Sequence, residues 1–443
     1  LASLYAPNGA LPAGTALRTS EFYNDAVNSE DFNIKEDYRR WKQPQRYAFS
    51  FCKCAPWIYD PGSKSRLLHL ESTVKMSHEF EDAVLRSIFI TATCPYLVLR
   101  VRRSSLVQDT LHQIQRSPED LKKPLKVHFV GEEGVDEGGV QKEFFSTILR
   151  EIFDPVYGMF RQDEDTRLCW FNALTLELDM EYELIGILLG LAIYNGHILD
   201  CRFPMVVYRK LLGYMPTFED LREVDPALAS GLQKLLDFDG DVQEAFDLNF
   251  QLSYDVFGET REVDLLPDGA NTPVTNDSRG QYVWLYTRHT LETSIERQFA
   301  AFARGFYRMC GGPVMQLFQP EELEQLVCGS PELDFVALEM ATVYDDGYDS
   351  ESPTVRDFWE VVHALPAEEK QGLLRFVTGS DRVPIKGLGS LPFVISRNGP
   401  DTDRLPTAHT CFNHLLLPQY ESAEKLGRLL RLAIGNAVGF GLV

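Results

Sequence analysis

The eleven residues from Leu184 to Tyr194 form the most apolar run of the chain and contain no charged side chain. A helix that crosses a bilayer needs about twenty apolar residues, so this run is too short to span a membrane. A helix that is apolar all round is stable only when other segments cover it. The run therefore predicts a buried helix inside a globular protein.

Length and composition agree with a folded protein of more than one domain. The chain has 443 residues, of which 44% are hydrophobic, so it can bury a sizeable core. Its formal charge of −22 argues against nonspecific nucleic-acid binding, which requires Lys and Arg to neutralise phosphates. We expect neither a nucleic-acid nor a membrane partner. No signal peptide is recognisable, and the start at Leu1 rather than Met predicts a fragment of a longer protein.

The cysteine pattern predicts reduced thiols and a cytoplasmic or nuclear location. Eight cysteines occur at positions 52, 54, 94, 169, 201, 310, 328 and 411, without the spacing of a disulfide framework. Cys52 and Cys54 form the one close pair, and no second pair follows at zinc-ligand spacing. We therefore expect no metal site.

The first third of the chain gives mixed signals. Residues 1–20 are rich in small residues and predict a flexible leader, and residues 21–110 predict an extension with a helix over 79–89 and a strand over 97–102. Helical spacing follows at 106–115 and 140–152. The glycine-rich loop at 131–139 lacks the Gly-Lys-Ser/Thr ending of a phosphate loop and carries four carboxylates, which favours a structural turn.

The last third predicts alternating helices and strands after a short connector. A helix over 320–327 ends at Gly329-Ser330-Pro331, a combination that stops a helix. Beyond it, the pattern predicts helices over 355–363, 367–378 and 422–435, and a strand over 391–396.

Cys411 is the candidate nucleophile. It lies in the run Leu-Pro-Thr-Ala-His-Thr-Cys-Phe-Asn at 405–413, where proline and polar residues predict a loop. The thiolate is the reactive form of cysteine, and an accessible loop beside a histidine favours it. The alternative is an ordinary cysteine, and the local sequence alone does not exclude it.

Several further blocks resemble those of the HECT-type ubiquitin ligases, in the same order. They are Gly131–Phe145, Gly186–Asn195, Phe203–Leu211, Phe376–Pro384, Gly399–Pro406 and the run around Cys411. The resemblance covers roughly residues 95–443 and is greatest to the branch that contains the ligase of Angelman syndrome, including the C-terminal Gly-Phe-Gly-Leu-Val.

This resemblance implies a bilobal α+β fold. The expected parts are a leader and N-terminal extension (1–110), a mainly helical N-lobe (111–328), a hinge (329–331) and an α/β C-lobe (332–443). Within the N-lobe, residues 219–290 correspond to the small subdomain that docks the ubiquitin-conjugating enzyme.

The same resemblance implies a ligase that needs no cofactor. Cys411 would take ubiquitin from the conjugating enzyme as a thioester and pass it to a lysine of a protein substrate. His409 and Thr410 are candidates for orienting or polarising the thiol, although local packing explains His409 equally well. Phe440, in the glycine-rich tail, would support transfer to the lysine.

Six apolar residues match the positions of the family's docking groove. They are Leu228, Leu232, Phe238, Phe246, Tyr282 and Tyr286. Aromatic anchors are typical of protein interfaces, but the pattern alone favours core positions for all six.

Other roles near Cys411 stay open. Asn413 and His414 could donate to a developing oxyanion, whereas Asp401 and Asp403 could accept a proton from lysine or simply form turns. Two rival functions remain, a Cys/His hydrolase that would release free ubiquitin and a noncatalytic scaffold that would not depend on Cys411.

Overall fold

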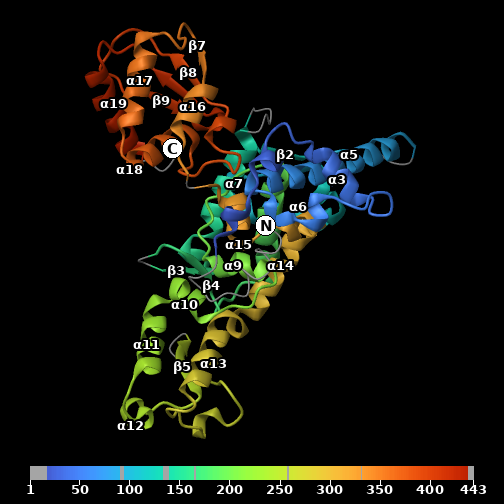
Figure 1. The fold of residues 1–443 in the computed structure, drawn as a ribbon, viewed down its shortest axis with the longest axis vertical. Coiled ribbons are helices and arrows are strands. Elements are labelled where there is room, and N and C mark those ends of the chain that lie inside the picture. The colour runs from blue at the N-terminus through green and yellow to red at the C-terminus, as the bar shows by residue number, and fades with distance from the viewer. Residues whose placement is uncertain are drawn as a thin grey trace.

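The computed structural model describes residues 17–89, 94–132, 139–163, 166–256, 259–330 and 332–437. Helices and small sheets alternate along the chain, in agreement with the predicted α+β class (Figure 1). The buried apolar side chains form two separate clusters, one from Val27 to Cys328 and one from Phe335 to Ile434. We call residues 17–330 the larger body and residues 332–437 the smaller body.

The apolar run forms the helix α8 (Asp179–Asn195), which is buried as predicted. It packs against α14 (Glu296–Cys310) with almost no space between the two backbones. A Cβ atom added at Gly186 would lie 2.0 Å from the carbonyl oxygen of Phe302, and one added at Gly305 would lie 2.0 Å from a carbonyl oxygen of α8. Only glycine permits this approach, so the contact explains the glycines inside both helices.

The N-terminal segment leads into one long helix. Its helices are α2 (Asp25–Asn28), α3 (Ile34–Lys42), α4 (Phe51–Cys54) and α5 (Pro61–Phe89). The helix predicted over 79–89 is only the end of α5, because polar residues in its first half obscure the apolar periodicity. The Asp60 carboxylate accepts the Ser63 backbone N–H at 2.6 Å and caps the start of this helix. Most of the predicted leader lies outside the described residues.

Residues on both sides of the predicted 110/111 boundary share one core. Strand β1 (Leu97–Val101) pairs in parallel with β2 (Leu125–Phe129), and the boundary falls inside the connecting helix α6 (Leu106–Arg116). The boundary therefore divides a helix, because the apolar side chains before and after it pack into the same cluster.

A buried ion pair also ties the N-terminal segment to the end of the larger body. The Lys64 ammonium on α5 donates to both carboxylate oxygens of Glu322 at 2.7 Å, and the Tyr23 hydroxyl donates to the same carboxylate at 2.7 Å. Glu322 belongs to α15 (Pro320–Cys328), which was predicted over 320–327. Burial lowers the pKa of Lys64, whereas Glu322 opposes that shift.

Two further helices and two short strands belong to the larger body. They are α7 (Gly139–Ile152), β3 (Phe160–Gln162), β4 (Cys169–Phe171) and α9 (Met205–Leu211). Of the four carboxylates of the glycine-rich loop, the three at 133–138 lie outside the described residues, and Glu132 pairs with Arg103.

Residues 218–291 form an extension of the larger body, at the end opposite the smaller body (Figure 1). Its elements are α10 (Phe218–Val224), α11 (Pro226–Asp237), α12 (Val242–Phe246), β5 (Gln251–Val256), β6 (Glu259–Asp264) and α13 (Arg279–Leu291). The strand predicted over 249–254 corresponds to β5, two residues later. We call this part the distal region.

The smaller body places helices around a four-stranded sheet of order β7-β8-β10-β9. Its helices are α16 (Phe335–Ala341), α17 (Pro353–Ala364), α18 (Ala367–Thr378) and α19 (Ala423–Ala437), and its strands are β7 (Val343–Asp345), β8 (Val394–Arg397), β9 (Thr407–His409) and β10 (His414–Leu417). The three predicted helices are confirmed. The predicted strand at 391–396 begins three residues later, as β8.

The chain passes between the bodies directly after α15. Gly329 has φ +81°, a left-handed conformation that favours glycine. Ser330 exchanges two backbone hydrogen bonds with Val383 of the smaller body, at 2.8 and 3.0 Å. Pro331, the last residue of the predicted hinge, lies outside the described residues. Among the described helices, none combines the length and apolarity needed to cross a membrane.

Candidate functional site

Cys411 lies at the turn between two antiparallel strands of the smaller body. The short 3-10 helix η10 (Thr410–Phe412) joins β9 to β10, and His409 pairs with His414 across the turn. Asn413 closes the turn with φ +50°, a conformation that Asn tolerates better than most residues. The backbone of Cys411 therefore occupies a tight turn, as the surrounding sequence predicts, while its side chain lies outside the described part of the structure.

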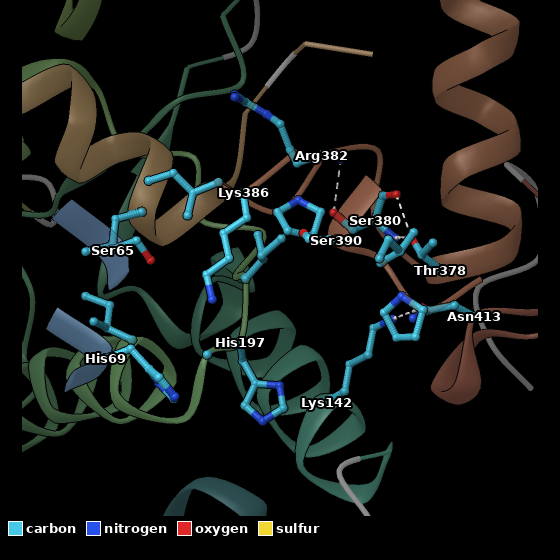
Figure 2. Close-up of a pocket in the computed structure, with 18 of the residues that line it drawn as sticks. Ser65, His69, Lys142, His197, Thr378, Ser380, Arg382, Lys386, Ser390 and Asn413 are labelled. Carbon is cyan, nitrogen blue, oxygen red and sulfur yellow. Dashed lines mark hydrogen bonds between the residues drawn. The ribbon is translucent and has the colours of Figure 1, made fainter. Parts of the chain in front are cut away.

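A lysine from the larger body contacts this turn on both sides of Cys411. The Lys142 ammonium on α7 donates to the Thr410 carbonyl oxygen at 3.0 Å and to Asn413 Oδ1 at 3.1 Å (Figure 2). These bonds connect the two bodies at the turn. Sequence reasoning missed Lys142, although the residue stands inside the glycine-rich block, because its partners are about 270 residues away.

The two histidines of the turn face each other. Their ring centroids are 6.0 Å apart, and His414 Nε2 lies 2.7 Å from the Ser396 hydroxyl on β8. His414 is thus engaged with the sheet, and the Asn413 side-chain oxygen accepts from Lys142. The described contacts place neither side chain as an oxyanion donor.

The two aspartates before the turn bind a lysine of α19. Asp401 accepts from Lys425 at 2.8 Å and from the Glu421 backbone N–H at 3.1 Å, and Asp403 lies 3.3 Å from the Lys425 ammonium. The hydrogen bond from Lys425 lowers the pKa of Asp401. A carboxylate with a lowered pKa is a weaker base, so the turn-forming alternative explains these residues better.

The six candidate docking residues lie on the distal region and divide into two groups. Leu232 and Tyr282 are buried, with 5% and 4% of their surface exposed. Burial raises the pKa of Tyr282 to about 12. The other four, Leu228, Phe238, Phe246 and Tyr286, are half-buried against the core. Only this second group keeps surface for a partner in the structure as described.

Ring contacts hold the half-buried aromatics in place. Phe238 and Phe246 meet edge to face at 5.1 Å, and Tyr286 packs on Tyr282 at 5.9 Å. Leu232 and Tyr282 are part of the buried core in this structure. Trp284 on α13, which sequence reasoning did not single out, is 57% exposed.

The described residues contain no candidate metal site. Among the described residues, no three His, Cys, Asp or Glu side chains gather as metal ligands. Cys52 is buried and accompanied by Asp37, and burial raises the pKa of its thiol. Phe440 lies outside the described residues.

A protein-family model described as HECT-domain (ubiquitin-transferase) matches residues 146–443, which include the turn with Cys411. The chain belongs to the HECT-domain family. The match starts just after the glycine-rich block and runs through the distal region and the smaller body.

Curated relatives extend the similarity to nearly the whole chain. A mouse protein named probable E3 ubiquitin-protein ligase HECTD2 is 42% identical over 96% of this chain and 57% of its own length. The human probable E3 ubiquitin-protein ligase HERC4 is 40% identical over 97% of this chain and 43% of its own length. This HECT-domain chain therefore spans about half the length of these relatives, and its N-terminal segment shares in the similarity.

Proposed function

We propose that this HECT-domain chain is the catalytic part of a ubiquitin-protein ligase with Cys411 as its nucleophile. The observation that carries the proposal is the position of Cys411 at the β9–β10 turn, inside the part of the chain that matches the ubiquitin-transferase family. Its partners are ubiquitin, a ubiquitin-conjugating enzyme and protein substrates.

The chemistry consists of two acyl transfers. The Cys411 thiolate attacks the thioester carbonyl that joins ubiquitin to the conjugating enzyme, and the thiolate of that enzyme leaves. A neutral substrate lysine then attacks the new thioester, forms an amide and releases the Cys411 thiolate, while the surplus amine proton passes to solvent. The second step makes the cycle favourable, because an amide is more stable than a thioester.

The two bodies correspond to the two lobes of this proposal. The larger body, with the distal region as docking site for the conjugating enzyme, is the N-lobe, and the smaller body is the C-lobe. The distal region lies at one end of the molecule in Figure 1, whereas the turn with Cys411 contacts α7 at the boundary between the two bodies. Charging therefore requires the smaller body to move, and the short connector at 329–331 is where we place the hinge.

Three finer assignments belong to the same proposal. His409 and Thr410 orient the thiol, and Phe440 supports passage to lysine. The placement nearest the branch with the Angelman-syndrome ligase rests on the sequence blocks alone, as does the cytoplasmic or nuclear location.

The test is incubation with activating enzyme, conjugating enzyme and ubiquitin, followed by electrophoresis with and without thiol reductant. We expect a reductant-sensitive adduct that Cys411→Ala abolishes. Cys54→Ala, which changes an exposed cysteine elsewhere in the chain, serves as the control and should keep the adduct. Charging of Cys411→Ala would contradict the assignment, and release of free ubiquitin without conjugates would favour the hydrolase.

A further inference from the structure

A cavity of about 410 Å³ lies between the larger and the smaller body (Figure 2). The larger body lines it with α5, the start of α7 and the end of α8, and the smaller body lines it with the end of α18 and the segment that follows. The cavity lies beside the turn with Cys411, since Asn413 belongs to its wall. Its volume is that of a small-molecule site.

The wall of this cavity is basic although the chain is acidic. Its basic side chains are His69, Lys142, His197, Arg382 and Lys386, and none of the described residues that line it is Asp or Glu. The whole chain carries 65 acidic against 43 Lys and Arg side chains. A wall without carboxylates is therefore a local reversal of the overall charge.

Basic groups from the two bodies act on each other across the cavity. Lys386 of the smaller body points into it on the side of His69, which belongs to the larger body (Figure 2). Partial desolvation of the His69 ring lowers its pKa, and the positive charge of Lys386 lowers it further. No ion pair joins Lys386 to a described carboxylate, whereas Arg382 pairs with Glu324 at 3.3 Å. Protonation of His69 is therefore less favourable in this structure than in water.

Hydroxyl groups line the same cavity between the basic side chains. Ser65 comes from the larger body, and Thr378, Ser380 and Ser390 come from the smaller body. Lysine and histidine side chains recognise phosphate oxygens, whereas the Thr378 and Ser390 hydroxyls donate to backbone carbonyls of the smaller body. A ligand with several phosphates carries more charge and more acceptor oxygens than a single carboxylate, which suits a wall with basic groups on both bodies.

We propose that this cavity binds a soluble small molecule that carries several phosphate groups. The ligand bridges His69 of the larger body and Lys386 of the smaller body, and its negative charge favours the protonated form of His69. A bridging ligand stabilises the arrangement of the bodies seen here. Its effect on ubiquitin transfer rests on the proposed function, but its binding does not.

Binding is tested on the whole chain by titration calorimetry at 0.15 M salt. Inositol hexakisphosphate and ATP serve as alternative probes, and inorganic sulfate serves as the probe for a single anion. We expect micromolar binding of at least one polyphosphate and much weaker binding of sulfate. The stronger of the two polyphosphates identifies the ligand class as inositol or nucleotide phosphate.

The site is located with a double variant and a matched control. Lys386→Gln with His69→Gln removes one basic group from each body, and roughly tenfold weaker binding or more is expected for lost charge-assisted contacts. Lys53→Gln with His112→Gln makes the same changes at exposed positions outside the cavity and should bind as the wild type. Both positions of the first variant are exposed, so folding should survive, and circular dichroism checks it.

Three results overturn the proposal. They are absence of polyphosphate binding at 0.15 M salt, equal binding of sulfate, and equal loss of affinity in the two double variants. Because no ubiquitin is present, such a result leaves the proposed ligase activity untouched. Conversely, if the chain binds the polyphosphate but does not charge Cys411, the polyphosphate site is supported and the proposed ligase activity is contradicted.

Discussion

The interior of the larger body and the boundary between the two bodies are built from different contacts. Inside the larger body, distant segments meet through buried contacts, such as the glycine contact of α8 with α14 and the Lys64–Glu322 pair. Between the bodies, the contacts include the bonds of Lys142 to the turn and the Arg382–Glu324 pair, beside a cavity of about 410 Å³. The first kind specifies one packing, and the second kind can be exchanged with water.

This difference agrees with the proposed reaction. Packed apolar surfaces resist separation, because separation exposes them to water, whereas polar groups at an open boundary regain hydrogen bonds to water. We therefore expect the smaller body to change position at a low cost, while the larger body stays intact. Four substitutions test this contrast.

The largest effect is expected at the buried ion pair. Lys64→Met leaves the Glu322 carboxylate buried without its cation, and loss of one partner of such a pair costs about 3–5 kcal/mol of folding free energy. Chemical denaturation followed by circular dichroism measures it. Lys53→Met is the exposed control and should change the free energy of unfolding by less than about 0.5 kcal/mol.

A double variant tests whether the loss of stability comes from the unpaired Glu322 charge. Lys64→Met combined with Glu322→Leu removes both charges and should recover much of the lost stability, because buried pairs are often replaceable by apolar residues. Equal stability of Lys64→Met and the wild type would mean that the Lys64–Glu322 ion pair does not contribute to the stability of the fold.

The next effect is expected where α8 meets α14. Gly305→Ala places a methyl group 2.0 Å from a carbonyl oxygen, so the helices must separate at a cost of about 3 kcal/mol. Gly231→Ala on α11 meets no atom within 4 Å and should stabilise the chain by about 0.5–1 kcal/mol. Thermal unfolding of both variants measures the difference, and similar melting temperatures would contradict the close contact.

The sequence predicted the packing inside the bodies better than the contacts between them. The apolar run at 184–194 sufficed for α8, because a helix without a polar face has to be buried. The C-terminal helices followed from their spacing. The length of α5 did not, because its first half mixes polar residues with a few buried leucines and makes a tertiary pair between Lys64 and Glu322, 258 positions apart.

For the candidate site too, the sequence predicted the local features and missed the contacts between the bodies. The motif around Cys411 predicted its loop from local chemistry alone. Lys142 could not be assigned to that turn, because its contacts depend on how the two bodies meet. The docking set was identified by position only, so the sequence could not separate buried Tyr282 from half-buried Tyr286.

That pair of tyrosines gives the third test. Tyr286→Ala should weaken binding of the conjugating enzyme by about thirtyfold, or about 2 kcal/mol, if Tyr286 is an interface anchor. Tyr282→Ala should chiefly lower stability, because that ring is buried. Binding titrations and thermal melts of both variants are compared. Unchanged affinity in folded Tyr286→Ala would assign this residue to the core as well.

The smallest effect is expected at the boundary between the bodies. Lys142→Met keeps most of the side-chain length but removes the bonds to Thr410 and Asn413, which we expect to contribute about 1 kcal/mol because the site is only partly buried. Global stability should hardly change, since neither hydrophobic cluster loses a member. The smaller body should leave α7 more readily, and charging of Cys411 from a conjugating enzyme at the distal region should become about fivefold faster. Single-turnover charging measures this rate, with Lys142→Arg retaining the charge and Lys53→Met as the remote control. A large loss of folding stability in Lys142→Met would show instead that the boundary is as tightly built as the interior, and the contrast between the two regions would then fail.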